Sequence, residues 1–211
     1  MKFNTFYNSN GIGDVLLLSS GQGHRDDVAI QTKGSVTQLK RVSDDTIVGY
    51  NIQSISDYLT IEGAGHVTLT EQDEAVINQL LSEQGFEPIS LRFESALVVG
   101  YVTSCRDHED SDHLHVTTVN VGGERDLQVV CGAPNIDAEQ TVIVATPGTV
   151  MPNGVEIYTG ELRGVKSEGM ICSLRELGIK QASTERGIYV FNKAYQPGMS
   201  AMAAIKEELE Q

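Results

Sequence analysis

The residue types most capable of chemistry gather in one short segment. Residues 106–115 read RDHEDSDHLH, and carboxylates and imidazoles at this density are groups that ligate divalent metals. The spacing is that of a loop running into a strand, in which His113 and His115 share one face and Leu114 points to the other. Because the sequence offers no distant partner for these groups, we expect a solvated loop and no metal site.

Two cysteines are candidates for a nucleophile. Cys131 lies in VVCGAPN and Cys172 in MICSLRE, each among apolar neighbours and without a readable base beside it. We therefore expect buried, structural thiols. The sequence also lacks a G-x-S-x-G elbow, an H-E-x-x-H pair and the protein-kinase motifs. These absences predict that the protein is not an enzyme, has no catalytic residues and uses no cofactor.

The first thirty residues contain two further groups that chemistry might use. Four glycines match neither the dinucleotide-binding nor the P-loop spacing, so we expect them to be hairpin glycines: Gly11, Gly13, Gly21 and Gly23. Four titratable residues lie close in sequence and keep open the hypothesis of an enzymatic site: Asp14, His24, Asp26 and Asp27. Acidic turns between strands are usually solvated, and no nucleophile, base and orienting group can be named together here.

The most informative stretch is LRGVKSEGMICSLRELG, residues 162–178. It places Arg163 and Lys166 in one turn-forming segment with two glycines, so two cations, the Ser167 hydroxyl and exposed backbone amides can face the same phosphate. The alternative is that Arg163 and Lys166 pair with Glu161 and Glu168 in a solvated turn. Charge alone does not choose between these two interpretations.

The charge and composition of the chain limit where a phosphate-binding site can lie. The chain has 211 residues, 40% of them hydrophobic, and 15 basic against 29 acidic residues give a formal net charge of −14. Any RNA site must therefore be a local basic patch on an acidic body. Three widely spaced cysteines without a C-x-x-C pair argue against disulfides and a zinc ribbon. With no signal-peptide pattern and no apolar run of membrane-spanning length, we expect a cytoplasmic protein without a membrane partner.

The first half predicts a small α+β domain over residues 1–91. Short β segments separated by turn residues fill the region up to about residue 55: KFNTFYN, GIGDVLLLSS, VAIQT, VTQLKRV and TIVGYNIQSI. A helix should follow, because Thr70 can cap it with Asp73 three residues on, and Gly85 can end it.

The second half predicts a β-barrel over residues 92–196. After a strand in SLRFESALVVGYVTSC, four more are expected at 113–121, 126–132, 141–146 and 155–162, separated by Gly, Pro and Asn. Five strands of this length suit an OB-type Greek-key barrel. Residues 197–211 are expected to form a C-terminal helical tail. The predicted fold class is mainly β, an OB barrel preceded by a small α+β domain.

The motif LRGVKSEGMICS resembles the signature of the EMAP-like tRNA-binding domain, which occurs free-standing, in synthetase accessory proteins and near the start of bacterial phenylalanyl-tRNA synthetase β chains. The segments VVGYVTSC, HEDSDHL, LQVVCGAPNI and ATPGTVMPNG stand in the family's order, so the resemblance covers about residues 94–192. The layout with an N-terminal α+β unit is similar to the YtpR-type tRNA-binding proteins of bacteria.

This resemblance implies an OB fold that binds tRNA by its shape and backbone, without chemistry, and often as a dimer in relatives. The RNA-contacting residues it implies are Arg163, Lys166, Ser167, Glu168 and Met170, with Asn135 and His113 on facing loops. Glu168 is expected to fix the turn rather than touch phosphate. The family commonly has a lysine where Tyr101 stands and a lysine or arginine where His113 stands, so two cations are missing here.

A second hypothesis comes from the charge. An acidic surface can dock a basic partner, so the chain is alternatively a protein-interaction module for an aminoacyl-tRNA synthetase or a ribosomal component. The two hypotheses differ in whether RNA itself is bound.

Overall fold

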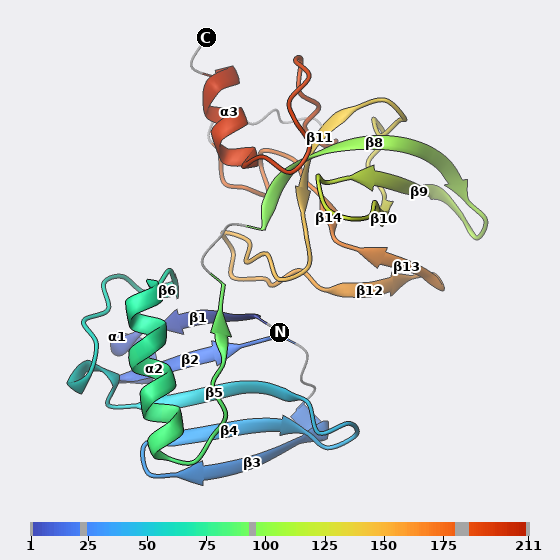
Figure 1. The fold of residues 1–211 in the computed structure, drawn as a ribbon. Helices are drawn as coiled ribbons and strands as arrows, with labels where there is room; N and C mark the ends of the chain where they lie inside the picture. The colour runs from blue at the N-terminus through green and yellow to red at the C-terminus, as the bar shows by residue number, and fades with distance from the viewer. Residues whose placement is uncertain (1, 22–24, 93–95, 180–185, 210–211) are drawn as a thin grey trace. The chain divides into compact units, whose positions relative to one another are not determined.

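The computed structural model of the protein describes residues 2–21, 25–92, 96–179 and 186–209. The chain divides into two compact units, residues 1–94 and residues 95–211 (Figure 1). Each unit has its own hydrophobic core.

Unit 1 is built on one mostly antiparallel sheet. Its strands are β1 (Lys2–Tyr7), β2 (Val15–Ser19), β3 (Val28–Lys33), β4 (Val36–Arg41), β5 (Ile47–Gln53), β6 (Gly65–Val67) and β7 (Ser90–Leu91). They lie in the order β3-β4-β5-β2-β1-β6, with β7 pairing in parallel with β1. One-turn helical segments join some of them: α1 (Ser9–Ile12), η1 (Arg25–Asp27) and η2 (Ile55–Asp57).

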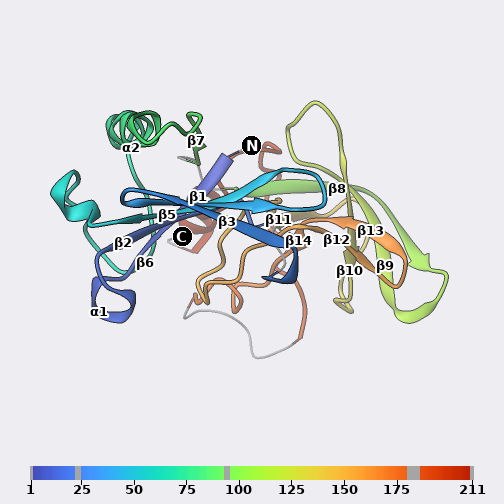
Figure 2. The same cartoon turned by 90° about the horizontal axis from the view of Figure 1, so that it is seen from below.

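The helix α2 (Glu71–Glu83) lies over one face of this sheet (Figures 1 and 2). Its Ile77 and Leu81 are fully buried, in the same cluster as Tyr50 and Ile52 of β5. The predicted capping box at its start is confirmed. The Thr70 hydroxyl accepts a hydrogen bond from the amide of Asp73 at 3.2 Å, and the Asp73 carboxylate accepts one from the amide of Thr70 at 2.8 Å.

Two details of unit 1 differ from the sequence prediction. The segment predicted as a strand from Gly11 starts with the helical turn α1 instead, and β2 begins only at Val15, because the Asn8 side chain caps that turn. Gly21 is not a hairpin glycine, since it follows β2, whose neighbours are β1 and β5 rather than β3. The pair Gly11 and Gly13 does lie in the connection of the β1–β2 hairpin, as expected. Gly23 falls outside the described residues.

Unit 2 is a barrel sheet with an added hairpin. Its strands are β8 (Leu97–His108), β9 (Ser111–Asn120), β10 (Leu127–Cys131), β11 (Thr141–Ala145), β12 (Thr159–Leu162), β13 (Val165–Glu168) and β14 (Met170–Ile171). The five-stranded sheet has the order β10-β9-β8-β11-β14, and β12 pairs with β13 in a separate hairpin. If these five strands are numbered by their order along the chain, they lie in the sheet as 3-2-1-4-5. This is the connectivity of an OB barrel.

The predicted fold class is confirmed: a mainly β chain in which a small α+β unit precedes an OB-type barrel. The prediction for the fifth barrel strand was wrong. Within 155–162 only Thr159–Leu162 is a strand, and it pairs with β13, while the fifth place in the sheet belongs to β14. The sequence predicts a turn over residues 163–170, because Gly164 and Gly169 flank the segment. The alternation of apolar and polar residues between them is too short to indicate a strand.

The C-terminal helix α3 (Ala201–Leu209) packs on the barrel. Its Ala201, Ala204 and Ile205 are buried in a cluster with Leu97 and Ile143 of the sheet, because these small and branched side chains fall on one helix face. Among the described residues, no helix is long and apolar enough to cross a membrane.

Removing the cap of α2 tests the account of unit 1. We expect Thr70→Ala to lower the free energy of unfolding of this unit by about 1 kcal/mol, because the amide of Asp73 loses its acceptor. Thr70→Ser keeps the hydroxyl and is the matched control. Urea unfolding followed by circular dichroism measures both. Equal stability of the Ala and Ser variants would contradict a contribution from the cap.

Candidate nucleic-acid interface

Arg163 and Lys166, the two cations of the segment 162–178, lie on the β12–β13 hairpin. Leu162 and Val165 are paired, so Arg163 and Gly164 form a two-residue loop. Both loop residues have positive φ, +47° for Arg163 and +78° for Gly164, which is the pattern of a type I′ turn. This turn matches the twist of the strands, and it leaves the Arg163 side chain exposed at the hairpin tip.

Strand β13 fastens this hairpin to the free edge of β10. The buried Ser167 hydroxyl accepts a hydrogen bond from the amide of Val130 at 3.1 Å, and the Glu168 carboxylate lies 3.4 Å from the amide of Gln128. In return the Gln128 side chain donates to the carbonyl of Lys166 at 2.8 Å. Side-chain hydrogen bonds thus replace backbone pairing here, and they close the barrel seam between Gln128 and Val130.

Glu168 also binds the two cations nearest to it. Its carboxylate lies 2.7 Å from the Arg125 guanidinium and 2.7 Å from the Lys166 ammonium. The Glu168 side chain is 7% exposed, whereas those of Arg125 and Lys166 are 64% and 54% exposed. The hydrogen bonds from Arg125 and then Lys166 lower the pKa of Glu168 to about 2. A single buried carboxylate therefore orients two cations that still face solvent.

Strand β14 can follow β13 only because residue 169 is glycine. Gly169 has φ +135°, and a Cβ there would lie 2.6 Å from the carbonyl oxygen of Ala145 in β11. No side chain fits this close approach, so the glycine in the sequence motif serves the chain path between the two strands.

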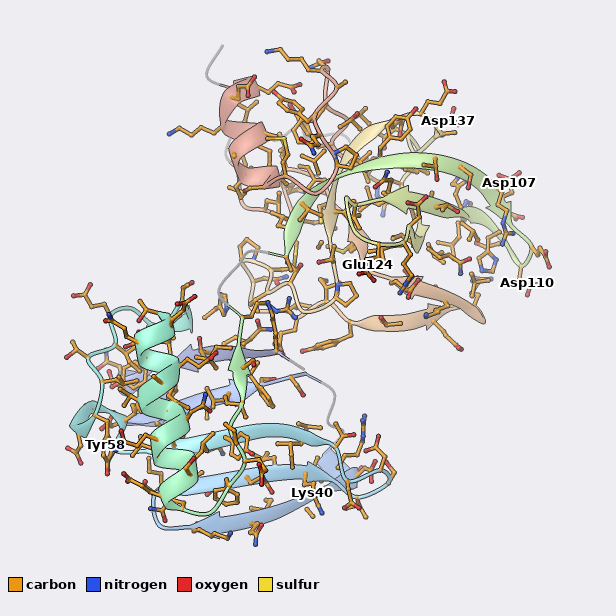
Figure 3. All side chains as sticks on the ribbon, viewed as in Figure 1. Lys40, Tyr58, Asp107, Asp110, Glu124 and Asp137 are labelled. Carbon is orange, nitrogen blue, oxygen red and sulfur yellow. The ribbon has the colours of Figure 1, made fainter. Side chains whose placement is uncertain are left out.

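Hydrogen bonds join the tip of the β12–β13 hairpin to the tip of the β8–β9 hairpin. The Arg163 guanidinium donates to the carbonyl of Asp110, in the β8–β9 turn, at 2.8 Å. The buried His108 ring accepts from the amide of Asp110 through Nδ1, so its Nε2 carries the proton toward the carbonyl of Leu162, 3.2 Å away. Figure 3 labels Asp107 and Asp110 at this end of the β8–β9 hairpin.

We call Arg125, Arg163 and Lys166 the cationic edge of unit 2. The alternative in which Arg163 and Lys166 pair with carboxylates is realised in part. Lys166 does pair with Glu168, but Arg163 bonds a carbonyl rather than Glu161, and Arg125 adds a cation to the same carboxylate. Two of the three cations therefore share one buried carboxylate, and the third bonds a carbonyl. The exposed carboxylate of Asp107 is paired with His115 at 3.3 Å.

The remaining predicted residues lie around a groove of about 730 Å³ next to this edge. Met170 and His113 line it directly. Asn135 does not; its side chain donates to the carbonyl of Ile188 at 3.0 Å and accepts from the amide of Ile188 at 2.9 Å. Asn135 therefore holds one wall of the groove.

Sequence reasoning missed three arginines at these surfaces. Arg125 belongs to the cationic edge, and Arg175 and Arg186 line the groove. Each lies in a connection between regular elements, where neither periodicity nor a motif indicates the direction of a side chain. Tyr101, for which the resemblance implied a lysine in relatives, is 36% exposed on β8.

The two candidate nucleophiles belong to the hydrophobic core of unit 2. Cys131 and Cys172 are buried as predicted, and burial raises the pKa of the Cys172 thiol to about 12, which keeps it protonated and unreactive. Within the described ranges no three His, Cys, Asp or Glu side chains gather as metal ligands.

The acidic residues of unit 1 are not gathered either. The Asp14 carboxylate accepts from the Ser56 hydroxyl at 2.7 Å, and that of Asp27 accepts from the Ser43 hydroxyl at 2.7 Å. Ser43 precedes β5 and Ser56 follows it, so the two carboxylates lie near opposite ends of that strand. The fourth residue of this hypothesis, His24, lies outside the described residues.

Neutralising Glu168 tests its role in closing the barrel. The folded pKa of about 2 is below the ordinary value of 4.5, so the stability from ionised Glu168 is present above pH 4.5 and is lost as the pH falls toward 2. We expect Glu168→Gln to cost about 1–2 kcal/mol at pH 7 and less at pH 3. Urea unfolding at both pH values measures this difference.

Glu161→Gln is the matched control for that change. Glu161 is an exposed carboxylate on β12, opposite Lys166 in the register, so its neutralisation removes the same charge without touching β10. Equal losses of stability in the two variants, or a Glu168→Gln effect that does not change with pH, would contradict a specific role for Glu168.

Comparison with protein families matches each unit to a different profile. Residues 97–200 match the family described as "Putative tRNA binding domain", and residues 23–92 match a family described as a domain of unknown function. The β subunit of phenylalanine–tRNA ligase from Staphylococcus aureus is 50% identical over 113 residues, which are 52% of this chain and 14% of that subunit. The similarity to that enzyme thus concerns one domain of it.

One relative matches along nearly the whole chain. The Bacillus subtilis protein named "Putative tRNA-binding protein YtpR" is 42% identical over 196 residues, 92% of this chain and 97% of the relative. Among solved structures, the C-terminal domain of Plasmodium vivax p43 aligns with 48% of this chain and 56% of its own at 22% identity and a TM-score of 0.36. The family assignment rests on the first of these matches: the protein belongs to the YtpR family.

Proposed function

We propose that this protein binds tRNA or another structured RNA through the OB unit, without catalysing a reaction. The observation that carries this proposal is the cationic edge. In a chain of net charge −14, Arg125 and Lys166 share one buried carboxylate, Arg163 is fixed by the carbonyl of Asp110, and all three cations keep their charged groups exposed. Clusters of exposed cations on a fixed backbone suit phosphate oxygens at set distances from one another.

The names of the relatives support the same ligand. The profile that matches unit 2 and the relative that matches the whole chain are both named for tRNA binding. Acidic surface elsewhere repels nucleic acid, so only an RNA whose backbone follows the cationic edge gains binding energy. Recognition of this kind depends on the shape of the RNA more than on its sequence.

We also propose a cellular setting and partners for this binding. Binding takes place in the cytoplasm, with an aminoacyl-tRNA synthetase or a ribosomal component as a further partner, and two copies of the chain act together as a homodimer. The acidic body supports the protein partner, because it presents charge complementary to a basic surface. If that docking is the main function, a pull-down recovers the same partner after nuclease treatment.

Removing two cations of the edge tests the proposal. We expect Arg163→Glu combined with Lys166→Ala to weaken tRNA binding at least tenfold. The slope of log affinity against log salt should become less steep by roughly 0.7 to 0.9 for each phosphate that the protein no longer neutralises. Alanine is used at position 166 because a new carboxylate there would lie beside Glu168 and disturb the fold. Fluorescence anisotropy with bulk tRNA at low and moderate salt measures both quantities.

The matched control changes the same charges away from the edge. Lys206→Glu in α3 combined with Lys40→Ala in β4 alters the net charge equally. Lys206 is exposed, and the Lys40 side chain is 41% exposed. This control should bind tRNA like the unchanged protein. Equal losses in the two double variants would mean that overall charge, and not the cationic edge, governs binding.

A further inference from the structure

The groove beside the cationic edge occupies the part of the barrel seam that stays open. Strands β10 and β14 are the two edges of the five-stranded sheet. Ser167 and Glu168 of β13 cover the first part of β10, up to Val130. The end of β10, with Val130 and Cys131, and strand β14, with Met170 and Ile171, both line the groove. Edge strands leave backbone donors and acceptors without ladder partners, and such groups can bind a ligand.

The groove has a fixed wall. The side chain of Asn135 bonds both the amide and the carbonyl of Ile188, and the Gln140 side chain in turn holds the carbonyl of Asn135 at 2.9 Å. A Cβ at Gly187 would lie 2.6 Å from the Asn135 side chain, so glycine lets the two segments meet this closely. The wall is therefore positioned before any ligand arrives, which lowers the entropy cost of binding.

The chemistry of the groove differs from that of the cationic edge. Its floor is apolar and buried, formed by Cys131, Ile171 and Ile188. Around it the cations Arg175 and Arg186 are balanced by the carboxylates of Asp112 and Glu176. A surface that binds phosphate alone carries excess positive charge. An apolar floor with both cations and carboxylates around it suits a flat heterocycle whose edge has donors as well as acceptors.

Several lining groups are available to a ligand. The described residues offer no hydrogen bond or ion pair to the guanidinium groups of Arg175 and Arg186 or to the ring of His113, and all three side chains are exposed. Guanidinium and imidazole planes can stack on a nucleobase, and guanidinium groups bind the adjoining phosphate. The Glu176 carboxylate, by contrast, already accepts from the amide and the hydroxyl of Ser173.

We propose that the groove binds an unpaired nucleotide of the RNA, with its base over the apolar floor and its phosphate at Arg175 and Arg186. A volume of about 730 Å³ lies within the range of roughly 300–1,000 Å³ that small-ligand sites occupy. A paired base within a duplex cannot enter, because its neighbours in the stack block it. The inference rests on the proposed function, and it adds a preference for RNA with single-stranded nucleotides.

Two RNA probes separate the groove from the cationic edge. One is a blunt RNA duplex, and the other is the same duplex with a single-stranded extension. The full-length protein should bind the extended duplex about tenfold more tightly. Arg175→Ala combined with Arg186→Ala should remove this preference and leave the affinity for the blunt duplex unchanged. Arg163→Glu with Lys166→Ala should weaken binding of both probes by the same factor.

Other outcomes distinguish a failure of the groove inference from a failure of the RNA-binding proposal. Equal affinity of the unchanged protein for the two probes, or equal loss for both probes in the Arg175 and Arg186 variant, would overturn the groove inference while leaving the RNA-binding proposal intact. Absence of binding to tRNA and to both probes would overturn the proposed function itself, and the groove inference with it.

A second measurement reports the groove directly. In protein labelled at the methionine methyl groups, addition of a 5′-mononucleotide should shift the NMR resonance of Met170, which lines the groove. Met202, on α3 and 46% exposed, is the internal control and should not move. A protein that binds tRNA but shows no shift at Met170, or equal shifts at Met170 and Met202, would contradict binding in the groove.

Discussion

The carboxylate of Glu168 is the interaction on which the candidate interface depends. It joins β13 to the amide of Gln128 at the free edge of β10, and it holds Arg125 and Lys166 by ion pairs of 2.7 Å. A buried carboxylate is costly unless donors surround it, and here two of the donors are the exposed cations Arg125 and Lys166. Closing the barrel and orienting the cations are thus one structural event. This accounts for the acidic residue between the cations and the glycine of the segment 162–178.

The acidic composition of the chain is compatible with a local cationic site. With 29 acidic and 15 basic residues, most of the surface repels a polyanion, and the cationic edge stands out against it. The Asp107 carboxylate near the tip of the β8–β9 hairpin is paired with His115, and the Asp110 carbonyl fixes Arg163. The same hairpin therefore supplies both the negative charges that limit binding and a bond that holds one cation in place.

Much of the fold could be predicted from the sequence because its signals are local. Alternating β-branched residues indicated β9, β10 and β11, and the Thr70 box indicated the start of α2. The fifth barrel strand, β14, was not predicted, because it has only two residues, Met170–Ile171. Its position also depends on the close approach of Gly169 to the Ala145 carbonyl, which the sequence does not indicate. The motif located Arg163 and Lys166, but the part played by Arg125 depends on a contact with Glu168, 43 residues away. Asn135 was predicted at a binding surface, yet only its bonds to Ile188 reveal that its side chain supports the wall.

Amide hydrogen exchange of the full chain with and without tRNA tests the central claim most directly, because it reports on the unchanged protein at every segment. The account predicts that tRNA slows exchange in the β12–β13 hairpin, around Arg125 and along the groove beside β14. Exchange in β3, β4 and β5 of unit 1 should stay the same. Slowing confined to unit 1, or bound tRNA with no slowing in the β12–β13 hairpin, would contradict the assignment of the RNA site to the cationic edge.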